Sequence, residues 1–193
     1  MEHEIYFATT NSSKVKSLQI YFSEKIKILQ VKLELPEPRA DDLRLIARVK
    51  VLFACEHIDH PCIALDAGFF IPSLNGFPKA FVNFFLETIG LEGLLKLVED
   101  KDRSCYFKNC LAYYDGKISE PIYFESDVPG TLATEILGQD KSNAWSVLWK
   151  IFIPAGKTQT IAQMSNEEYL SWRQERGTES FGAKFAAWYL SQK

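Results

Sequence analysis

The N-terminal stretch EIYFATTNSSKVKSLQIYF constrains the fold more than any other segment of the chain. Residues 4–9 have the composition of a buried strand, and the strand stops at the small, polar or cationic run TTNSSK. A helix is predicted immediately afterwards, over residues 12–24, with Val15, Leu18 and Phe22 at helical spacing. A strand that passes through a short polar loop into a helix is a unit typical of α/β proteins.

The remaining pattern extends this alternation and predicts an α/β fold with a mixed, curved central sheet and flanking helices. We expect strands at 26–33, at 62–70 with its end at Asp66, and at 145–153, and a hairpin around Asp115-Gly116. We expect helices at 79–98, 166–175 and 179–191, and another capped by Asp41 or Asp42. That capped helix presents one apolar face, made of Leu45, Ile46, Val49, Leu52 and Phe53. Residues 1–193 are interpreted as one domain with two lobes.

Composition excludes several classes of protein. With 47% hydrophobic and 24% charged residues, the chain has enough apolar side chains for a packed core, so disorder is not expected. A net charge of −3 gives no attraction to nucleic acid or to anionic membranes, and no apolar run is long enough to cross a bilayer. Glu2 and Glu4 argue against a signal peptide, and four cysteines do not suggest a disulfide scaffold. We therefore expect a cytoplasmic protein.

The loop TTNSSK has the properties of an anion site. Free backbone N–H groups and the positive end of the helix dipole meet at a helix N-terminus. Lys14 lies in the first turn and can reach a phosphate as a point charge. The side chains of Thr9, Thr10, Asn11, Ser12 and Ser13 add further donors. An ordinary capped helix with a solvated lysine accounts for this stretch equally well, so both interpretations stay open.

Two carboxylates follow predicted strands. Glu37 lies in a loop stiffened by prolines, and Asp66 is placed at the carboxyl end of the apolar run CIALD. Ligands of α/β sheets bind at the carboxyl ends of the strands. A pair of carboxylates suits Mg²⁺, which also takes water and substrate phosphates as ligands. Lys50, on the helix between them, supplies a second cation. Each carboxylate could instead be an ordinary loop residue or helix cap, and Lys50 could be a solvated surface lysine.

At this point the sequence resembles the inosine triphosphate pyrophosphatase family. FATTNSSK is similar to the opening TGNxxK motif of that family, and LPEPRADDLRLIARVKVLFAC resembles its LPE segment. The stretch PCIALDAGFFIPSLNGFPKAFVNFFLETIGLEGLLKLVED resembles the segment of the family that contains the acidic residues and the Gly-x-Pro motif. The match keeps its order and spacing almost from end to end.

The resemblance implies a Mg²⁺-dependent enzyme that removes non-standard purine nucleotides. Water would attack between the α and β phosphates of a nucleoside triphosphate and give monophosphate and pyrophosphate. Glu37 and Asp66 would hold the metal, and Asp66, Lys14 and Glu37 would be the catalytic residues. The resemblance also implies a homodimer and a nucleotide cleft enclosed by the two lobes. The residues implied to bind substrate are Thr9, Thr10, Asn11, Lys14, Lys50, Gly68, Trp149, Arg176 and Phe181.

The segments that would read the base depart from the family pattern. When the chain is aligned on Phe152 and Pro154, Trp149 replaces an aspartate of the family, and Phe181 and Gly182 replace its histidine and arginine. Phenylalanine and glycine have no polar side chain, and an indole can only donate. Stacking on Trp149 or Phe181 would remain, and stacking tolerates any base. We therefore expect a weak or altered base preference.

Other interpretations remain open from the sequence. A catalytically weak or inactive nucleotide-binding relative with a regulatory role is the main alternative to an enzyme, and a phosphatase acting on another metabolite is the third. The segment CEHIDHPC contains two cysteines and two histidines, but their spacing does not match a structural zinc site. We expect these cysteines to be core residues instead.

Overall fold

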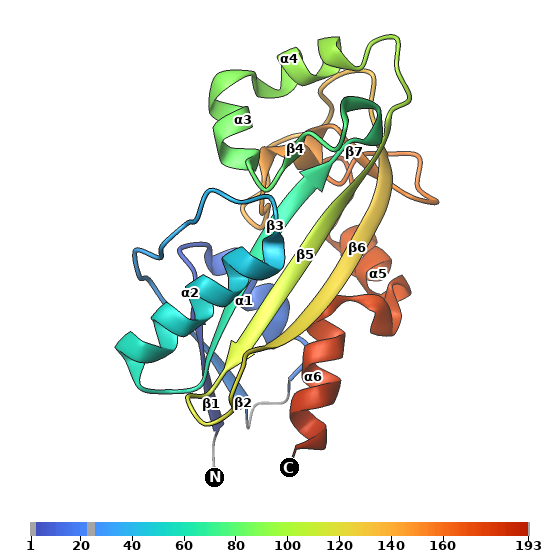
Figure 1. Ribbon diagram of the computed structural model, residues 1–193. Helices are drawn as coiled ribbons and strands as arrows, with labels where there is room; N and C mark the ends of the chain where they lie inside the picture. Colours follow the sequence, from blue (N-terminus) through green and yellow to red (C-terminus); the bar gives the residue numbers. More distant parts are fainter. Residues whose placement is uncertain (1–2, 23–25, 193) are drawn as a thin grey trace. The chain divides into compact units, whose positions relative to one another are not determined.

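The computed structural model describes residues 3–22 and 26–192, and its elements form an α/β fold (Figure 1). The strands are β1 (His3–Ala8), β2 (Ile26–Val31), β3 (Cys62–Phe70), β4 (Pro78–Lys79), β5 (Ser104–Tyr114), β6 (Ile122–Leu132) and β7 (Phe152–Pro154). The α-helices are α1 (Ser12–Gln19), α2 (Leu43–Ile58), α3 (Val82–Thr88), α4 (Gly90–Leu97), α5 (Asn166–Glu175) and α6 (Phe181–Ser191). The short 3₁₀ helices are η1 (Pro72–Leu74), η2 (Val147–Lys150) and η3 (Gly177–Glu179). The predicted fold class is confirmed.

The sheet is mixed, as predicted. Its strand order is β2-β1-β3-β5-β6-β7, and β4 pairs with β3 outside this path. β1 is parallel to both β2 and β3, whereas β4 is antiparallel to β3 and β7 is antiparallel to β6. Helix α1 connects β1 to β2 on one side of it, and α2 connects β2 back across β1 to β3 on the other side. Because such crossovers are right-handed, the two helices lie on opposite faces of the sheet (Figure 1). The sheet therefore has a topological switch point between β1 and β3, the position where α/β proteins bind ligands.

The chain divides into two compact units. Unit 1 comprises Met1–Ala67, Asn109–Ser126 and Thr178–Lys193, and unit 2 comprises Gly68–Lys108 and Asp127–Gly177. Each of the strands β3, β5 and β6 contributes residues to both units. The interpretation of residues 1–193 as a single domain stays a prediction.

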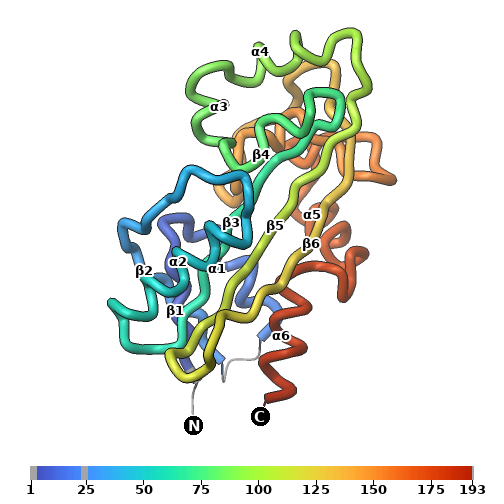
Figure 2. Tube along the Cα trace, in the orientation of Figure 1, coloured from blue at the N-terminus to red at the C-terminus, as the bar shows by residue number. Residues whose placement is uncertain are grey.

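The core of unit 1 includes an aromatic cluster between α6 and the β5–β6 hairpin. The ring of Phe185 in α6 lies 5.3 Å from Phe124 of β6 and 5.9 Å from Tyr113 of β5, and Phe22, in the segment after α1, lies 5.6 Å from the same ring. The hairpin turn lies at the same end of unit 1 as the α2–β3 connection (Figure 2). Gly116 has a φ of 75° in this turn, which confirms the hairpin predicted at Asp115-Gly116.

Helix α2 is confirmed, with Asp42 as its N-cap, but its buried face differs from the prediction. The side chain of Asp42 accepts a hydrogen bond from the backbone N–H of Arg44 at 2.9 Å. Of the five apolar residues assigned to the face, Ile46 is buried and Leu45 is 45% exposed. The buried residues are Leu43, Ile46, Ala47, Lys50, Val51, Ala54 and Cys55. The face therefore consists mostly of small residues, and it includes a lysine.

Three other elements differ from their predictions. The strand predicted at 145–153 is wrong in its first part, because η2 occupies Val147–Lys150 and the strand β7 begins only at Phe152. The helix predicted over 12–24 ends at Gln19, and residues 23 and 24 of that prediction lie outside the described residues. The helix predicted over 79–98 is divided into α3 and α4 at Gly90, whose φ is 71°.

The core of unit 2 lies around the aromatic residues of β3, β5 and β7. The rings of Phe69 and Phe107 are 4.7 Å apart, and Phe152 lies 4.8 Å from Phe107. Trp149 and Trp172 belong to the same buried cluster. Among the described residues, no helix combines the length and the apolar character that crossing a membrane requires.

Candidate active site

The loop after β1 is shaped by its own polar side chains. The backbone N–H of Asn11 donates to Thr9 Oγ1 at 3.1 Å, and Asn11 Oδ1 accepts from the backbone N–H of Ser13 at 3.0 Å. Gln30 of β2 donates from Nε2 to the carbonyl oxygen of Thr9 at 3.0 Å and ties the loop to the neighbouring strand. Asn11 is therefore the N-cap of α1, and the first turn of the helix starts at the carboxyl end of β1.

Lys14 lies in that first turn and is partly buried. Burial lowers the pKa of its ammonium; the negative charges of Asp66 and Glu37 act in the opposite direction, and the positive charge of Lys50 adds to the lowering. The three groups that influence Lys14 are thus the two carboxylates and the second lysine singled out from the sequence. A cation with reduced hydration at a helix N-terminus is suited to holding an anion.

Lys50 joins the two predicted carboxylates. Its Nζ lies 2.9 Å from Glu37 Oε1 and 2.8 Å from Asp66 Oδ1. The side chains of Lys50 and Asp66 are 9% and 12% exposed, whereas that of Glu37 is 70% exposed. The structure therefore brings Glu37, Lys50 and Asp66 together in unit 1, with one carboxylate reaching solvent and the other enclosed.

Burial and charge act against each other in this group. For Asp66 burial is the largest influence and raises the pKa; the ammonium groups of Lys50 and Lys14 oppose it, Glu37 adds to it, and the pKa stays above the ordinary value. For Lys50 burial disfavours the charged form, but the charges and hydrogen bonds of Asp66 and Glu37 outweigh it and raise the pKa. Lys50 is therefore firmly protonated.

The prediction that β3 ends at Asp66 is wrong. The strand continues to Phe70, because beyond Asp66 it pairs with β4 through Phe69 and Phe70. The parallel neighbour β1 ends at Ala8, and its last recorded pair with β3 joins Phe7 to Ile63. Asp66 therefore lies past the carboxyl end of β1 although it is in the middle of its own strand. Asp66 therefore still lies where a ligand-binding carboxylate is expected, because the neighbouring strand β1 ends before it and not because β3 ends there.

The donor set fits a magnesium ion in its chemistry. Oxygens of Glu37 and Asp66 both lie within 3 Å of one cation, the Lys50 ammonium, so they converge on a single positive charge. Among the residues that the structure describes, no group of three or more His, Cys, Asp or Glu side chains could hold a metal. A magnesium ion held by two carboxylates together with water and substrate oxygens needs no third protein ligand.

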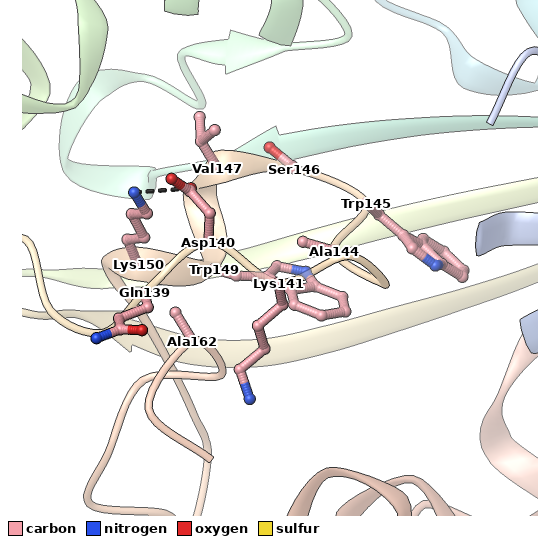
Figure 3. A pocket seen from close by; sticks show the side chains of 10 residues that line it. All are labelled: Gln139, Asp140, Lys141, Ala144, Trp145, Ser146, Val147, Trp149, Lys150 and Ala162. Carbon is pink, nitrogen blue, oxygen red and sulfur yellow. Dashed lines mark ion pairs between the residues drawn. The ribbon is translucent and has the colours of Figure 1, made fainter. Parts of the chain in front are cut away.

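Trp149, predicted to stack on the base, is largely a core residue of unit 2. It is 7% exposed, and its ring lies 5.1 Å from Tyr169. It also lines a cavity of about 300 Å³, with the ion pair of Lys150 and Asp140 at one end and Trp145 at the other (Figure 3). The structure places an edge of Trp149 at a cavity, and a stacking role stays a prediction.

Gly68 and Arg176 also belong to unit 2. A Cβ atom at Gly68 would lie 2.7 Å from the carbonyl oxygen of Lys79 and 2.7 Å from the ring of Phe70, so close packing of β3 on β4 requires glycine here. Arg176 donates to the carbonyl oxygen of Asp127 at 3.2 Å, and its guanidinium lies 5.8 Å from the Trp172 ring. Both residues have local structural contacts, and their roles in substrate binding remain predictions.

Phe181 is the first residue of α6 in unit 1 and is 9% exposed. The N-cap of the helix is Ser180, whose hydroxyl accepts from the backbone N–H of Ala183 and lies 3.0 Å from the hydroxyl of Tyr21. The Tyr21 ring occupies the space beside Gly182, where a Cβ atom would lie 2.6 Å from it. The hydroxyl groups of Ser180 and Tyr21 are thus engaged with each other and with the helix backbone, and Phe181 and Gly182 add no polar side chain at this helix start.

The zinc alternative is not supported in the described part of the chain. The thiols of Cys55 and Cys62 both donate to the carbonyl oxygen of His60, at 3.4 and 3.2 Å. The ring of His57 stacks on Phe53 with centroids 3.9 Å apart. All four cysteines are buried and free, as expected of core residues.

Sequence reasoning missed two polar contacts that organise the site. The support that Gln30 gives to Thr9 has no local signal, because the two residues are 21 positions apart. The ion pair of Lys50 with Asp66 did have a local signal in the sequence. Lys50 is at positions i+4 and i+7 from Ile46 and Leu43, within the buried stripe of α2, and a lysine there requires a partner.

Comparison with known proteins identifies the family of the chain. The model of the Ham1 family matches residues 5–176. A dITP/XTP pyrophosphatase of Saccharolobus solfataricus is 38% identical over 162 residues, which cover 83% of this chain and 81% of that protein. A dITP/XTP pyrophosphatase of Thermococcus kodakarensis is 34% identical over 164 residues, covering 84% and 85% of the two chains.

Solved structures show the same fold. A HAM1 protein from Coxiella burnetii superposes with a TM-score of 0.78 at 21% identity, covering 99% of this chain and all of that one. The Staphylococcus aureus Ham1 protein gives a TM-score of 0.77 at 22% identity, with 98% of this chain covered and 100% of the other. With its family model matched over most of its length and its relatives above 30% identity, this chain belongs to the Ham1 family.

Proposed function

We propose that this protein is a Mg²⁺-dependent nucleoside triphosphate pyrophosphatase. Its substrate is cleaved to the monophosphate and pyrophosphate, in a house-cleaning reaction that removes non-standard nucleotides. The observation that carries the proposal is the group formed by Lys50, Glu37 and Asp66 beside Lys14, at the carboxyl end of β1, in a member of a family whose relatives are named dITP/XTP pyrophosphatases. Hydrolysis of a phosphoanhydride depends on charge neutralisation and positioning, and these residues supply both.

In this mechanism the two lysines neutralise the triphosphate. Lys14 lies in the first turn of α1, where the helix dipole also favours negative charge. Thr9, Thr10 and Asn11 form the polar loop that surrounds the same helix end. Holding the phosphates in one geometry converts the attack of water into an effectively unimolecular step.

The carboxylates position the attacking water and the metal. Glu37 and Asp66 would hold the magnesium ion, which when bound neutralises phosphate charge and polarises the bond that is cleaved. Asp66 is the more enclosed of the two carboxylates, and burial raises its pKa, so it is the better acceptor for a proton of the water. Dependence on magnesium is supported by this pair of carboxylates and by the family resemblance, a homodimer by the resemblance alone, and a cytoplasmic location by the composition and the free cysteines.

We further propose an altered base preference. Trp149 is mostly buried, and Phe181 and Gly182 place no side-chain donor at the start of α6. Large discrimination between bases requires polar groups that would be left unpaired by the wrong base. Without such groups the enzyme should accept several bases or select a modified one.

A substrate panel tests both proposals. Pyrophosphate release should be measured as kcat/KM for inosine, xanthosine, adenosine, guanosine, cytidine and uridine triphosphates, each with and without Mg²⁺. We expect turnover that requires the metal, with less than about a hundredfold preference for any single base. Absence of turnover for every nucleotide would favour an inactive, nucleotide-binding relative, and a stronger preference for inosine triphosphate would contradict the altered base preference.

A further inference from the structure

The ammonium of Lys50 lies at the point where the two proposed metal ligands converge. Its Nζ is 2.9 Å from Glu37 Oε1 and 2.8 Å from Asp66 Oδ1, so two of its three N–H donors are used. Both carboxylates are therefore already engaged by a cation that belongs to the protein.

Lys50 is held at this point by the fold. It lies in the buried face of α2, between Ala47 and Ala54, and its side chain is 9% exposed. A buried ammonium that loses its partners becomes an uncompensated charge, which is strongly unfavourable. Lys50 can leave the carboxylates only if another negative group replaces them.

A divalent cation that arrives alone has no such group to offer. It would have to share Glu37 and Asp66 with the ammonium, and two positive charges in contact repel each other strongly in a poorly solvated site. A triphosphate changes this balance, because its oxygens can accept the N–H donors of Lys50 while the carboxylates turn to the metal. The positive charge of Lys14, which acts electrostatically on the same three groups, adds to the demand for an anion.

We propose that Lys50 is an exchangeable counter-cation, which neutralises Glu37 and Asp66 in the nucleotide-free protein and passes to the substrate phosphates when the metal takes the carboxylates. The inference rests on the proposed function for the identity of the anion. It predicts that metal and triphosphate bind cooperatively, each increasing the affinity for the other by the same factor. The protein would then avoid capturing metal ions unproductively when no substrate is present.

Metal titration of variants tests this exchange. Mn²⁺ serves as the probe, and its binding to the nucleotide-free protein is measured by calorimetry at pH 8 for the wild type, Lys50→Met and Arg48→Met. Arg48 is the matched control because it lies on the same helix, carries the same charge and pairs with a different carboxylate, Glu120, at the surface. Lys50→Met should bind Mn²⁺ at least about tenfold more tightly than the wild type, within the usual range of coupling between ligands, and Arg48→Met should match the wild type. Equal or weaker binding by folded Lys50→Met would overturn the proposal.

A second measurement uses only the wild-type protein, in case Lys50→Met does not fold. The NMR signal of the Lys50 ammonium is followed while Mg²⁺ is added alone, and again with a non-hydrolysable nucleoside triphosphate. The signal should keep its position with Mg²⁺ alone at concentrations that shift it fully when the nucleotide is present. The same shift with Mg²⁺ alone would overturn the exchange. Neither measurement needs turnover, so a protein that shows the coupling but releases no pyrophosphate would refute the proposed function and leave this inference standing.

Discussion

The proton of Lys50 links a single residue to the stability of the fold. Its pKa is above the ordinary value of 10.5, because the charges and hydrogen bonds of Asp66 and Glu37 outweigh the effect of burial. The folded protein therefore binds this proton more tightly than the unfolded chain does. The stabilisation is complete below the pKa of the unfolded state and is lost as the pH rises through the higher pKa of the folded state.

We predict that the free energy of unfolding falls between pH 10 and pH 12 more steeply in the wild type than in Lys50→Met. Urea unfolding at several pH values measures this difference, and the titrating lysines and tyrosines other than Lys14, whose pKa Lys50 lowers, contribute equally to both proteins. Parallel pH profiles for the two proteins would show that the ion pair does not hold the proton of Lys50 in the folded state.

The junction of α1 and α6 gives a prediction at the scale of elements. Glycine in a helix is ordinarily less stable than alanine by about 0.5–1 kcal/mol. At Gly182 the opposite is expected, because an added Cβ would lie 2.6 Å from the Tyr21 ring and 3.2 Å from Leu18 Cδ1. Gly182→Ala should destabilise the protein by roughly 1–3 kcal/mol, the usual cost of overpacking.

A double-mutant cycle separates this contact from other effects. In a Tyr21→Ala background the ring is absent, and the alanine at position 182 should cost much less or become favourable. The free energies of unfolding of the two single variants and the double variant are obtained from urea titrations. Additive effects would mean that the Tyr21 ring does not determine the requirement for glycine.

The order of the elements was predictable from sequence, and several of their details were not. Asp42 is recognisable as a cap because its side chain can accept a backbone N–H, a purely local interaction. The buried face of α2 was assigned to its large residues, but close packing selected small ones such as Ala47 and Ala54. The strand predicted at 145–153 failed because tertiary packing and the Ser146 cap of η2 overrode the β-propensity of an aromatic run.

The site was likewise predicted only in part, because local patterns identify single residues but not their tertiary contacts. Charged residues in a polar loop and a buried strand were identified individually, and their roles came from the family resemblance. The buried stripe of α2 shows that Lys50 needs a partner, but it does not say which residue that partner is, because Glu37 and Asp66 are 13 and 16 positions from Lys50. Asp66 lies inside β3, which continues for four more residues after it. The ion pair with Lys50 compensates the negative charge of the buried Asp66 carboxylate.

At the scale of the whole molecule, the two units contain different sets of the predicted site residues. Unit 1 contains Lys14, Glu37, Lys50 and Asp66, the residues of the proposed chemistry. Unit 2 contains Trp149, Arg176 and Gly68, which have structural contacts of their own. The proposed reaction therefore depends most on unit 1, and its central residue is Asp66.

The most direct test is an analysis of the products formed by the wild type, Asp66→Asn and the exposed control Asp100→Asn. With Mg²⁺ and the best nucleotide of the substrate panel, phosphorus NMR should show monophosphate and pyrophosphate in equal amounts for the wild type and for Asp100→Asn. Asp66→Asn should retain the fold and lose a factor of about 10² or more in rate, the scale expected for a positioned general base or metal ligand. Formation of diphosphate and inorganic phosphate, or full Mg²⁺-dependent turnover by Asp66→Asn, would contradict the account.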